Sequence, residues 1–167
     1  MSEELKEWGK ALVEAFVVLL ILYIFLWPTK IDGISMEQTF SHGDRVTMSR
    51  FMTKFSFYER GDIIVFNMEE DGERIQVVKR IIAMGGDRVE IKDGRVFVNE
   101  IALEEAYAVG ETLGTVDVTV PQDAIFVMGD NRLHSFDSRN IGVVAKEKLS
   151  GRVLFRWYPF SHIKAFF

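Results

Sequence analysis

The chain has 167 residues, enough for one modest domain of roughly 100–150 residues and a small accessory element. Its formal net charge of −5, without any run of Lys or Arg, argues against a nucleic-acid-binding protein. The absence of cysteine excludes disulfides, thiolate zinc sites and cysteine nucleophiles, and the three histidines are not spaced as metal ligands, so we expect no metal site.

The N-terminal part of the chain contains one long apolar segment. Ala11–Trp27 is apolar except for Glu14. Seventeen residues in a helix span about 25 Å, slightly less than a hydrocarbon core of about 30 Å. Trp8 and Trp27 bracket the segment as interfacial anchors would, and Pro28 ends the helix.

This segment has two other interpretations, a cleaved signal peptide or a buried core helix. A cleaved signal peptide would need a small-x-small cleavage site, and the sequence has none after the segment. A buried core helix would normally have a polar stripe, and the segment has none. We therefore predict a short tail over residues 1–10 and a retained transmembrane helix over residues 11–28. The few lysines and arginines on either side do not decide its orientation.

After Pro28 the pattern changes to short runs of alternating apolar and polar residues, which predict β-strands. A hairpin with an Asp93-Gly94 turn is among them. Without a long helical pattern in this part, we predict a mostly-β domain over residues 29–167. The predicted strands cover residues 44–48, 62–66, 74–84, 89–98, 116–120, 124–128 and 153–157.

An aromatic-rich connection joins the first two predicted strands. It contains Phe51, Phe55, Phe57 and Tyr58. These side chains could form a patch that dips into the membrane or could belong to the hydrophobic core, and we favour the core.

Ser35 is a candidate nucleophile, because it ends a Gly-x-Ser stretch shortly after the apolar segment, but a serine needs a base. His42 and His134 are candidate bases, and Lys79 is a better one. Lys79 shares one face of a predicted strand with isoleucine and valine, and burial there would lower the pKa of its amine toward about 8. On this pattern alone, a charged Lys79 that snorkels at a strand edge is the simpler interpretation.

Residues 129–139 hold an unusual density of polar groups. The stretch contains two aspartates, two arginines and two serines. A solvated loop could carry them, but so dense a set indicates an interlocked hydrogen-bond network.

Four stretches in this order resemble the conserved boxes of bacterial type I signal peptidases, which are membrane-bound Ser-Lys endopeptidases. Residues 33–36 with Thr39 look like the nucleophile box, and residues 60–66 look like the strand box that follows. Residues 78–87 look like the general-base box, and residues 129–142 look like the final network box. The resemblance covers nearly the whole chain. It implies a signal-peptidase-like antiparallel β-sheet catalytic domain, with a small accessory β insertion at about residues 88–122.

The resemblance also implies roles for single residues. Ser35 would attack the scissile carbonyl, and neutral Lys79 would take its proton and later pass it to the leaving amine. Ser135 would orient the Lys79 amine, as an aspartate orients histidine in other triads. The Ser35 backbone N–H would help to bind the oxyanion. Gly33 stands where some members place a serine hydroxyl, so it can offer only its backbone.

The remaining implied roles concern support and substrate binding. Asp130 with Arg80, and Asp137 with Arg139, would form buttressing ion pairs. The substrate would lie extended beside residues 31–33 and the strand of Lys79. The candidates for apolar walls of shallow pockets are Ile31, Met36, Phe40 and Val78.

Two positions depart from the family's pattern. Gln38 stands where a proline is common, and Phe40 stands where a leucine is common. Because of these departures, we expect the rigidity of the turn and the shape of the pocket to differ from the family's pattern, while the class of enzyme is unaffected.

The function implied is removal of N-terminal signal peptides from exported preproteins at Ala-x-Ala sites, without a cofactor. Partners would be these signal peptides, membrane lipid and the nearby translocation machinery, with the N-terminus inside and the catalytic domain outside a bacterial cytoplasmic membrane. Three alternatives remain: a Ser-His signal peptidase, a soluble self-cleaving repressor peptidase, and a catalytically inactive, membrane-anchored scaffold that binds exported chains.

Overall fold

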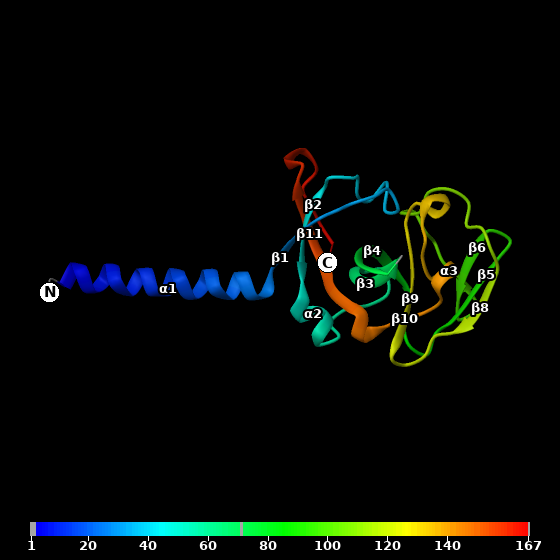
Figure 1. The fold of residues 1–167 in the computed structure, drawn as a ribbon, viewed down its shortest axis with the longest axis horizontal. Coiled ribbons are helices and arrows are strands. Elements are labelled where there is room, and N and C mark those ends of the chain that lie inside the picture. The colour runs from blue at the N-terminus through cyan, green and yellow to red at the C-terminus, as the bar shows by residue number, and fades with distance from the viewer. Residues whose placement is uncertain (1–2, 71, 167) are drawn as a thin grey trace.

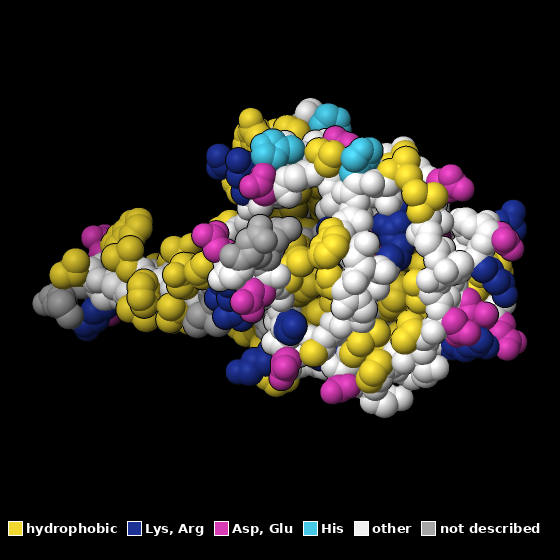
Figure 2. Space-filling view, turned by 45° about the vertical axis from the view of Figure 1, so that its right-hand side comes forward, with side chains coloured by type: hydrophobic (Ala, Val, Ile, Leu, Met, Phe, Trp, Pro, Cys, Tyr) yellow, Lys and Arg dark blue, Asp and Glu magenta, His cyan; other side chains and the backbone are white. Residues whose placement is uncertain are grey.

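The structure is a computed structural model that describes residues 3–70 and 72–166. Helix α1 (Glu3–Phe25) extends from one side of a β-rich body (Figure 1). Its apolar side chains are exposed along its length (Figure 2). Within residues 3–70 and 72–166, no helix is both long enough and apolar enough to cross a membrane.

The body is built on an eight-stranded antiparallel sheet in the order β1-β2-β11-β3-β4-β9-β10, with β12 paired to β11. The long β3–β4 hairpin lies at its centre, where β3 pairs along its whole length with residues 73–80 of β4. The strands of this sheet are β1 (Trp27–Lys30), β2 (Arg45–Ser49), β3 (Ile63–Glu70), β4 (Glu73–Ala83), β9 (Ala124–Met128), β10 (Val144–Ala145), β11 (Leu149–Tyr158) and β12 (Lys164–Ala165).

A second, four-stranded sheet is inserted between β4 and β9, within the range predicted for an accessory insertion. Its order is β7-β6-β5-β8. The β5–β6 hairpin turns at Asp93 and Gly94, both with positive φ, as the Asp-Gly pair predicts. Its strands are β5 (Arg88–Lys92), β6 (Arg95–Val98), β7 (Ile101–Ala102) and β8 (Val116–Thr119).

The helices of the body are short. They are α2 (Arg50–Lys54) and α3 (Ser138–Ile141), with 3₁₀ turns at Arg132–His134, Lys146–Lys148 and Phe160–His162. The mostly-β prediction for this part of the chain is therefore confirmed. Helix α2 was not expected from the sequence; the Ser49 side chain caps it by accepting a hydrogen bond from Met52 N–H.

The preference for a buried aromatic connection is wrong for three of its four residues. Tyr58 is buried at 7% exposure, but Phe51, Phe55 and Phe57 are 37%, 54% and 57% exposed. Phe51 and Phe55 are four residues apart on or beside α2, which places them on one side of it. We call the three exposed rings the aromatic patch; the Phe51 ring also lies 4.9 Å from that of Phe25, at the end of α1.

Candidate active site

The loop between β1 and β2 presents Ser35 at the surface of the body. Residues 34–40 form a compact turn in which Met36 C=O accepts hydrogen bonds from Thr39 and Phe40 N–H. The side chains of Ile31, Met36 and Phe40 anchor the loop in one core cluster together with residues of β2, β3 and β11. The apolar residues on either side of Ser35 therefore fix the position of its backbone.

The backbone at Gln38 explains one departure from the family pattern. Gln38 has φ +76°. A proline ring holds φ near about −65°, so proline cannot adopt this conformation. The turn after Ser35 thus has a shape that excludes the residue common at this position.

Lys79 reaches Ser35 from β4, which lies between β3 and β9 in the main sheet. The Lys79 Nζ lies 2.7 Å from Ser35 Oγ, and Lys79 is only 4% exposed. The pKa of the Lys79 amine is lowered from 10.5 to about 8. Burial is the largest cause; the charge of Asp137 opposes the shift, Arg139 adds to it, and Asp130 opposes it. The interpretation of Lys79 as a snorkelling surface lysine is therefore wrong.

The two histidines considered as bases point to other groups. His42 Nδ1 lies 3.0 Å from Asp32 Oδ1 and 3.3 Å from the backbone nitrogen of Gly33. His134 Nδ1 lies 3.2 Å from Asn131 Oδ1. In residues 3–70 and 72–166, neither histidine forms a hydrogen bond with Ser35.

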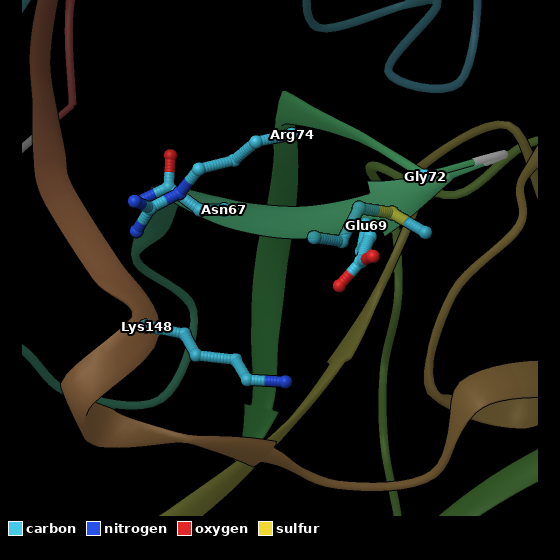
Figure 3. A pocket seen from close by; sticks show the side chains of 6 residues that line it. Asn67, Glu69, Gly72, Arg74 and Lys148 are labelled. Carbon is cyan, nitrogen blue, oxygen red and sulfur yellow. The ribbon is translucent and has the colours of Figure 1, made fainter.

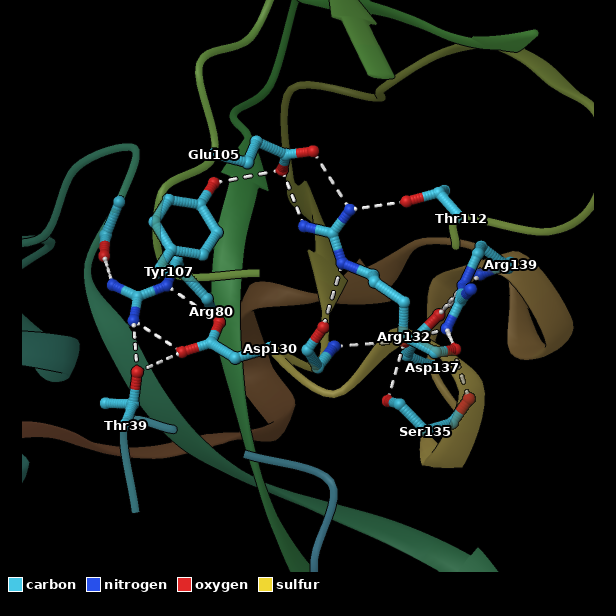
Figure 4. Close-up of polar contacts among 12 residues, drawn as sticks. Thr39, Arg80, Glu105, Tyr107, Thr112, Asp130, Arg132, Ser135, Asp137 and Arg139 are labelled. Carbon is cyan, nitrogen blue, oxygen red and sulfur yellow. Dashed lines mark hydrogen bonds and ion pairs between the residues drawn. The ribbon is translucent and has the colours of Figure 1, made fainter. Parts of the chain in front are cut away.

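The polar stretch at residues 129–139 forms a buried network around Asp137 (Figure 4). Asp137 accepts hydrogen bonds from Ser135 Oγ at 2.7 Å, from Gly129 N–H at 2.9 Å and from the Arg139 side chain at 2.9 and 3.0 Å. Burial alone would raise the pKa of the Asp137 carboxyl, but these donors and the Arg139 charge outweigh it and lower the pKa.

Ser135 thus has a different partner from the one that the resemblance implies. Its hydroxyl donates to Asp137, and within the described part of the chain no hydrogen bond joins Ser135 to Lys79. Ser135 is still close to the nucleophile: a Cβ added at Gly129 would meet both Ser135 Oγ and the backbone oxygen of Ser35.

A second buried network surrounds Arg80, next to Lys79 on β4 (Figure 4). Its guanidinium binds Asp130 with two hydrogen bonds of 2.9 and 2.6 Å and donates to Gly61 C=O at 2.7 Å. Thr39, from the loop that carries Ser35, hydrogen-bonds both Arg80 and Asp130. The two predicted ion pairs, Arg80–Asp130 and Arg139–Asp137, are therefore formed in the structure.

Sequence reasoning missed three residues of this region: Glu105, Tyr107 and Thr112. They come from the irregular segment between β7 and β8 and reach Arg80 and Arg132. A lone Glu, Tyr and Thr in a loop form no recognisable pattern, so the sequence carries no signal for them.

The predicted pocket residues are mostly in the core. Ile31, Met36 and Phe40 are at most 2% exposed, and Val78 is partly buried against the same cluster. They belong to the core cluster that anchors the Ser35 loop, and their contact with a substrate stays a prediction.

A cavity beside the β3–β4 hairpin lies away from Ser35. It has a volume of about 330 Å³ and is lined by Asn67, Met68, Glu69, Gly72, Arg74 and Lys148 (Figure 3). Arg74 lies five residues from Lys79, roughly 16 Å along β4. The cavity is therefore separate from the Ser35–Lys79 pair. Across the described residues, no group of three or more His, Asp or Glu side chains is placed to hold a metal ion.

Comparison with known proteins identifies relatives over almost the whole chain. The family described as "Signal peptidase, peptidase S26" matches residues 5–158. Signal peptidase I S of Bacillus subtilis is 35% identical, with 98% of this chain and 94% of the relative covered. Signal peptidase IB of Staphylococcus aureus is 33% identical over 98% of this chain and 95% of the relative. The crystal structure of a signal peptidase I from Enterococcus faecalis is 33% identical with a TM-score of 0.50, covering 58% of this chain and 96% of that one.

Proposed function

Since this chain belongs to the signal peptidase family, peptidase S26, it is a peptidase that cleaves signal peptides, and we propose that Ser35 and Lys79 carry the reaction. The observation that carries the proposal is the 2.7 Å contact between Lys79 Nζ and Ser35 Oγ, with the amine buried. A buried lysine with a pKa of about 8 is neutral in about a tenth of the molecules at pH 7. With an ordinary pKa of 10.5, only about one molecule in three thousand would have the neutral amine.

The reaction would proceed in two halves. Neutral Lys79 takes the proton of Ser35 Oγ as the oxygen attacks the scissile carbonyl, and the resulting ammonium gives that proton to the leaving amine. Water then attacks the acyl-enzyme, with Lys79 again as the base. Among residues 3–70 and 72–166, no partner is found for the Ser35 backbone N–H, so this group is available to the oxyanion. Gly33 N–H contacts His42 and is less available.

The substrate would bind in an extended conformation between two strand edges. Ile31 N–H donates to Asp44 C=O, and Ile31 C=O accepts from Gly43 N–H. Because backbone groups alternate in direction along an extended chain, the backbone N–H and C=O of Asp32 point to the opposite side, where a substrate would bind. On β4, strand β9 pairs only with positions from Arg80 onward, which leaves the preceding edge for a peptide. Ile31, Met36 and Phe40 are buried in one cluster with Val78 packed against it. We propose that this filled cluster leaves shallow pockets beside Ser35 that accept small residues such as Ala, as Ala-x-Ala sites require.

The polar networks would hold the reacting groups in place. Arg80 with Asp130 fixes the segment next to the Ser35 loop, and Arg139 with Asp137 fixes the segment next to Lys79. We propose that Ser135 supports Lys79 through Asp137, whose negative charge faces the amine.

We also propose that the anchor predicted for residues 11–28 holds the chain in a bacterial cytoplasmic membrane through residues 11–25 of α1, with residues 1–10 inside and the catalytic residues 29–167 outside, near the translocation machinery. Trp27 and Pro28 belong to β1 of the main sheet and not to the helix. Two observations support contact with lipid: the exposed apolar side chains of α1, and the aromatic patch that continues from its end. Because the chain has no cysteine, single-cysteine variants test this directly. With a membrane-impermeant maleimide, Asp93→Cys should react in intact spheroplasts and Glu4→Cys only after lysis. Equal reaction of both would refute the orientation.

Peptide cleavage tests the Ser35–Lys79 assignment. The full-length chain in detergent is assayed on a fluorogenic peptide with an Ala-x-Ala site from pH 6 to 10. Activity should rise through an apparent pKa of about 8 and be lost in Ser35→Ala and Lys79→Ala. Lys92→Ala, at an exposed lysine of the accessory sheet, is the control and should cleave normally. Activity that survives Lys79→Ala would turn attention to the histidines, and a folded but inactive wild type would favour the scaffold alternative.

A further inference from the structure

The segment between β7 and β8, residues 103–115, links the accessory sheet to the candidate active site. We call it the clamp loop. Val109 N–H donates to Asp130 C=O at 2.8 Å, and Arg132 N–H donates to Val109 C=O at 2.9 Å. The segment that the clamp loop contacts, residues 130–132, also contacts the nucleophile loop, because Asn131 N–H donates to Ser35 C=O at 3.0 Å. A movement of the clamp loop is therefore transmitted to Ser35 through one strand-like segment.

Glu105 of the clamp loop neutralises a buried arginine. It accepts hydrogen bonds of 2.9 and 2.6 Å from the Arg132 guanidinium, whose side chain is almost fully buried. Thr112 accepts a third bond and Gly129 C=O a fourth, so every nitrogen of this guanidinium has a partner. A buried bidentate pair of this kind fixes the distance between the loop and the 129–132 segment.

Tyr107 of the clamp loop covers Arg80. The Arg80 guanidinium carbon lies 4.1 Å from the centre of the Tyr107 ring, and the Tyr107 hydroxyl donates to Glu105 at 3.0 Å (Figure 4). The edge of the guanidinium is occupied by Asp130, Gly61 and Thr39, so the ring closes one of its faces. A desolvated cation on an aromatic face is held both electrostatically and by exclusion of water.

We propose that Glu105 and Tyr107 are positioning residues for the peptidase reaction: from the accessory sheet they hold Arg132 and the Arg80–Asp130 pair, and through them the placement of Ser35 against Lys79. This inference rests on the proposed roles of Ser35 and Lys79. A shift of about 1 Å in a reacting group costs on the order of 100-fold in rate, so a small loosening of the clamp loop lowers kcat.

Loosening of the clamp loop should also change the pKa of the Lys79 amine, because charged groups surround it. Asp130, Asp137 and Arg139 all face Lys79, and Asp130 raises the pKa of its amine. Arg80 binds Asp130 with two hydrogen bonds and lies against the Tyr107 ring, so we expect its positive charge to offset part of the Asp130 charge while Tyr107 holds it in place. Loosening Arg80 therefore raises the pKa of Lys79, an effect that a purely structural contact elsewhere would not have.

The test compares Tyr107→Leu with Tyr107→Phe, which keeps the ring but loses the hydroxyl. Phe97→Leu is the matched control, since it removes another contact of an aromatic ring with a cation, Lys92 at 4.8 Å, from the same accessory sheet. With the full-length chain in detergent and an Ala-x-Ala peptide, Tyr107→Leu should lower kcat at least about tenfold with KM within about twofold. Tyr107→Phe should stay within about threefold of the wild type, and Phe97→Leu should be unchanged.

An NMR titration of the Lys79 ε-carbon in the ¹³C-lysine-labelled chain gives a readout that does not need activity. Tyr107→Leu should raise the pKa of Lys79 by about half a unit or more, while Phe97→Leu leaves it in place. An inactive wild type would refute the proposed function, and this titration would still decide the role of the clamp loop. Equal losses in Tyr107→Leu and Phe97→Leu, equal losses in both Tyr107 variants, or an unmoved Lys79 titration in Tyr107→Leu would each overturn the inference. Glu105→Gln is less decisive, because the uncompensated Arg132 charge can itself prevent folding.

Discussion

Replacing Lys79 with methionine should abolish activity and at the same time stabilise the fold. The amine is buried, and its pKa falls from 10.5 to about 8. This shift of about 2.5 units corresponds to roughly 3 kcal/mol that the folded protein loses by burying a charged amine at neutral pH. Methionine has a similar shape and no charge. After subtracting about 1 kcal/mol for the hydrogen bond to Ser35, we expect Lys79→Met to raise the free energy of unfolding by about 2 kcal/mol at pH 7.

The pH dependence of this gain identifies its cause. Between about pH 8 and pH 10.5 the unfolded chain binds a proton on Lys79 that the folded protein has released, so the stability of the wild type rises through this window. Below about pH 8 both states are protonated and the penalty is present in full. The advantage of Lys79→Met should therefore be largest at neutral pH and disappear toward pH 10.5.

Urea unfolding in detergent at pH 7, 9 and 10.5, followed by circular dichroism, measures the effect, with peptide cleavage assayed on the same samples. Lys92→Met is the control at an exposed lysine and should change the free energy of unfolding by less than about 0.5 kcal/mol at each pH. A Lys79→Met variant that is less stable than the wild type at pH 7, or whose advantage does not shrink with rising pH, would refute the reasoning from burial.

Three further predictions concern the same site. Gly129→Ala should abolish peptide cleavage, because its Cβ would collide with Ser135 Oγ and lie 2.5 Å from the backbone oxygen of Ser35. The pKa of the buried Asp137 is lowered, so its stabilisation is present above about pH 4 and is lost as the pH falls through the folded pKa. Asp137→Asn should therefore cost about 3 kcal/mol in urea unfolding at pH 7, and this cost should shrink as the pH is lowered below about 4. Gln38 has φ +76°, so Gln38→Gly should raise the free energy of unfolding by about 1 kcal/mol and Gln38→Pro should lower it by at least about 2 kcal/mol, which thermal melts would check.

The sequence by itself determined the class of fold and the reacting pair that we propose. Alternation of apolar and polar residues has a period of two only in a strand, so the main strands could be predicted from local pattern. The same alternation put Lys79 on an apolar face, where burial lowers the pKa of its amine. The resemblance of four separate stretches then placed Ser35 with Lys79, and the structure brings their side chains to 2.7 Å.

Only the tertiary structure decided which polar groups support this pair. Ser135 donates to Asp137 rather than to Lys79, and Glu105 and Tyr107 reach the network from a loop of the accessory sheet. Phe55 is 54% exposed although its side chain is apolar, and the rings recorded beside it are those of Phe51 and Phe57, which are themselves exposed. Hydrogen-bond partners and burial depend on where segments distant in the chain meet, to within a few tenths of an ångström, and local periodicity carries no information about those distances.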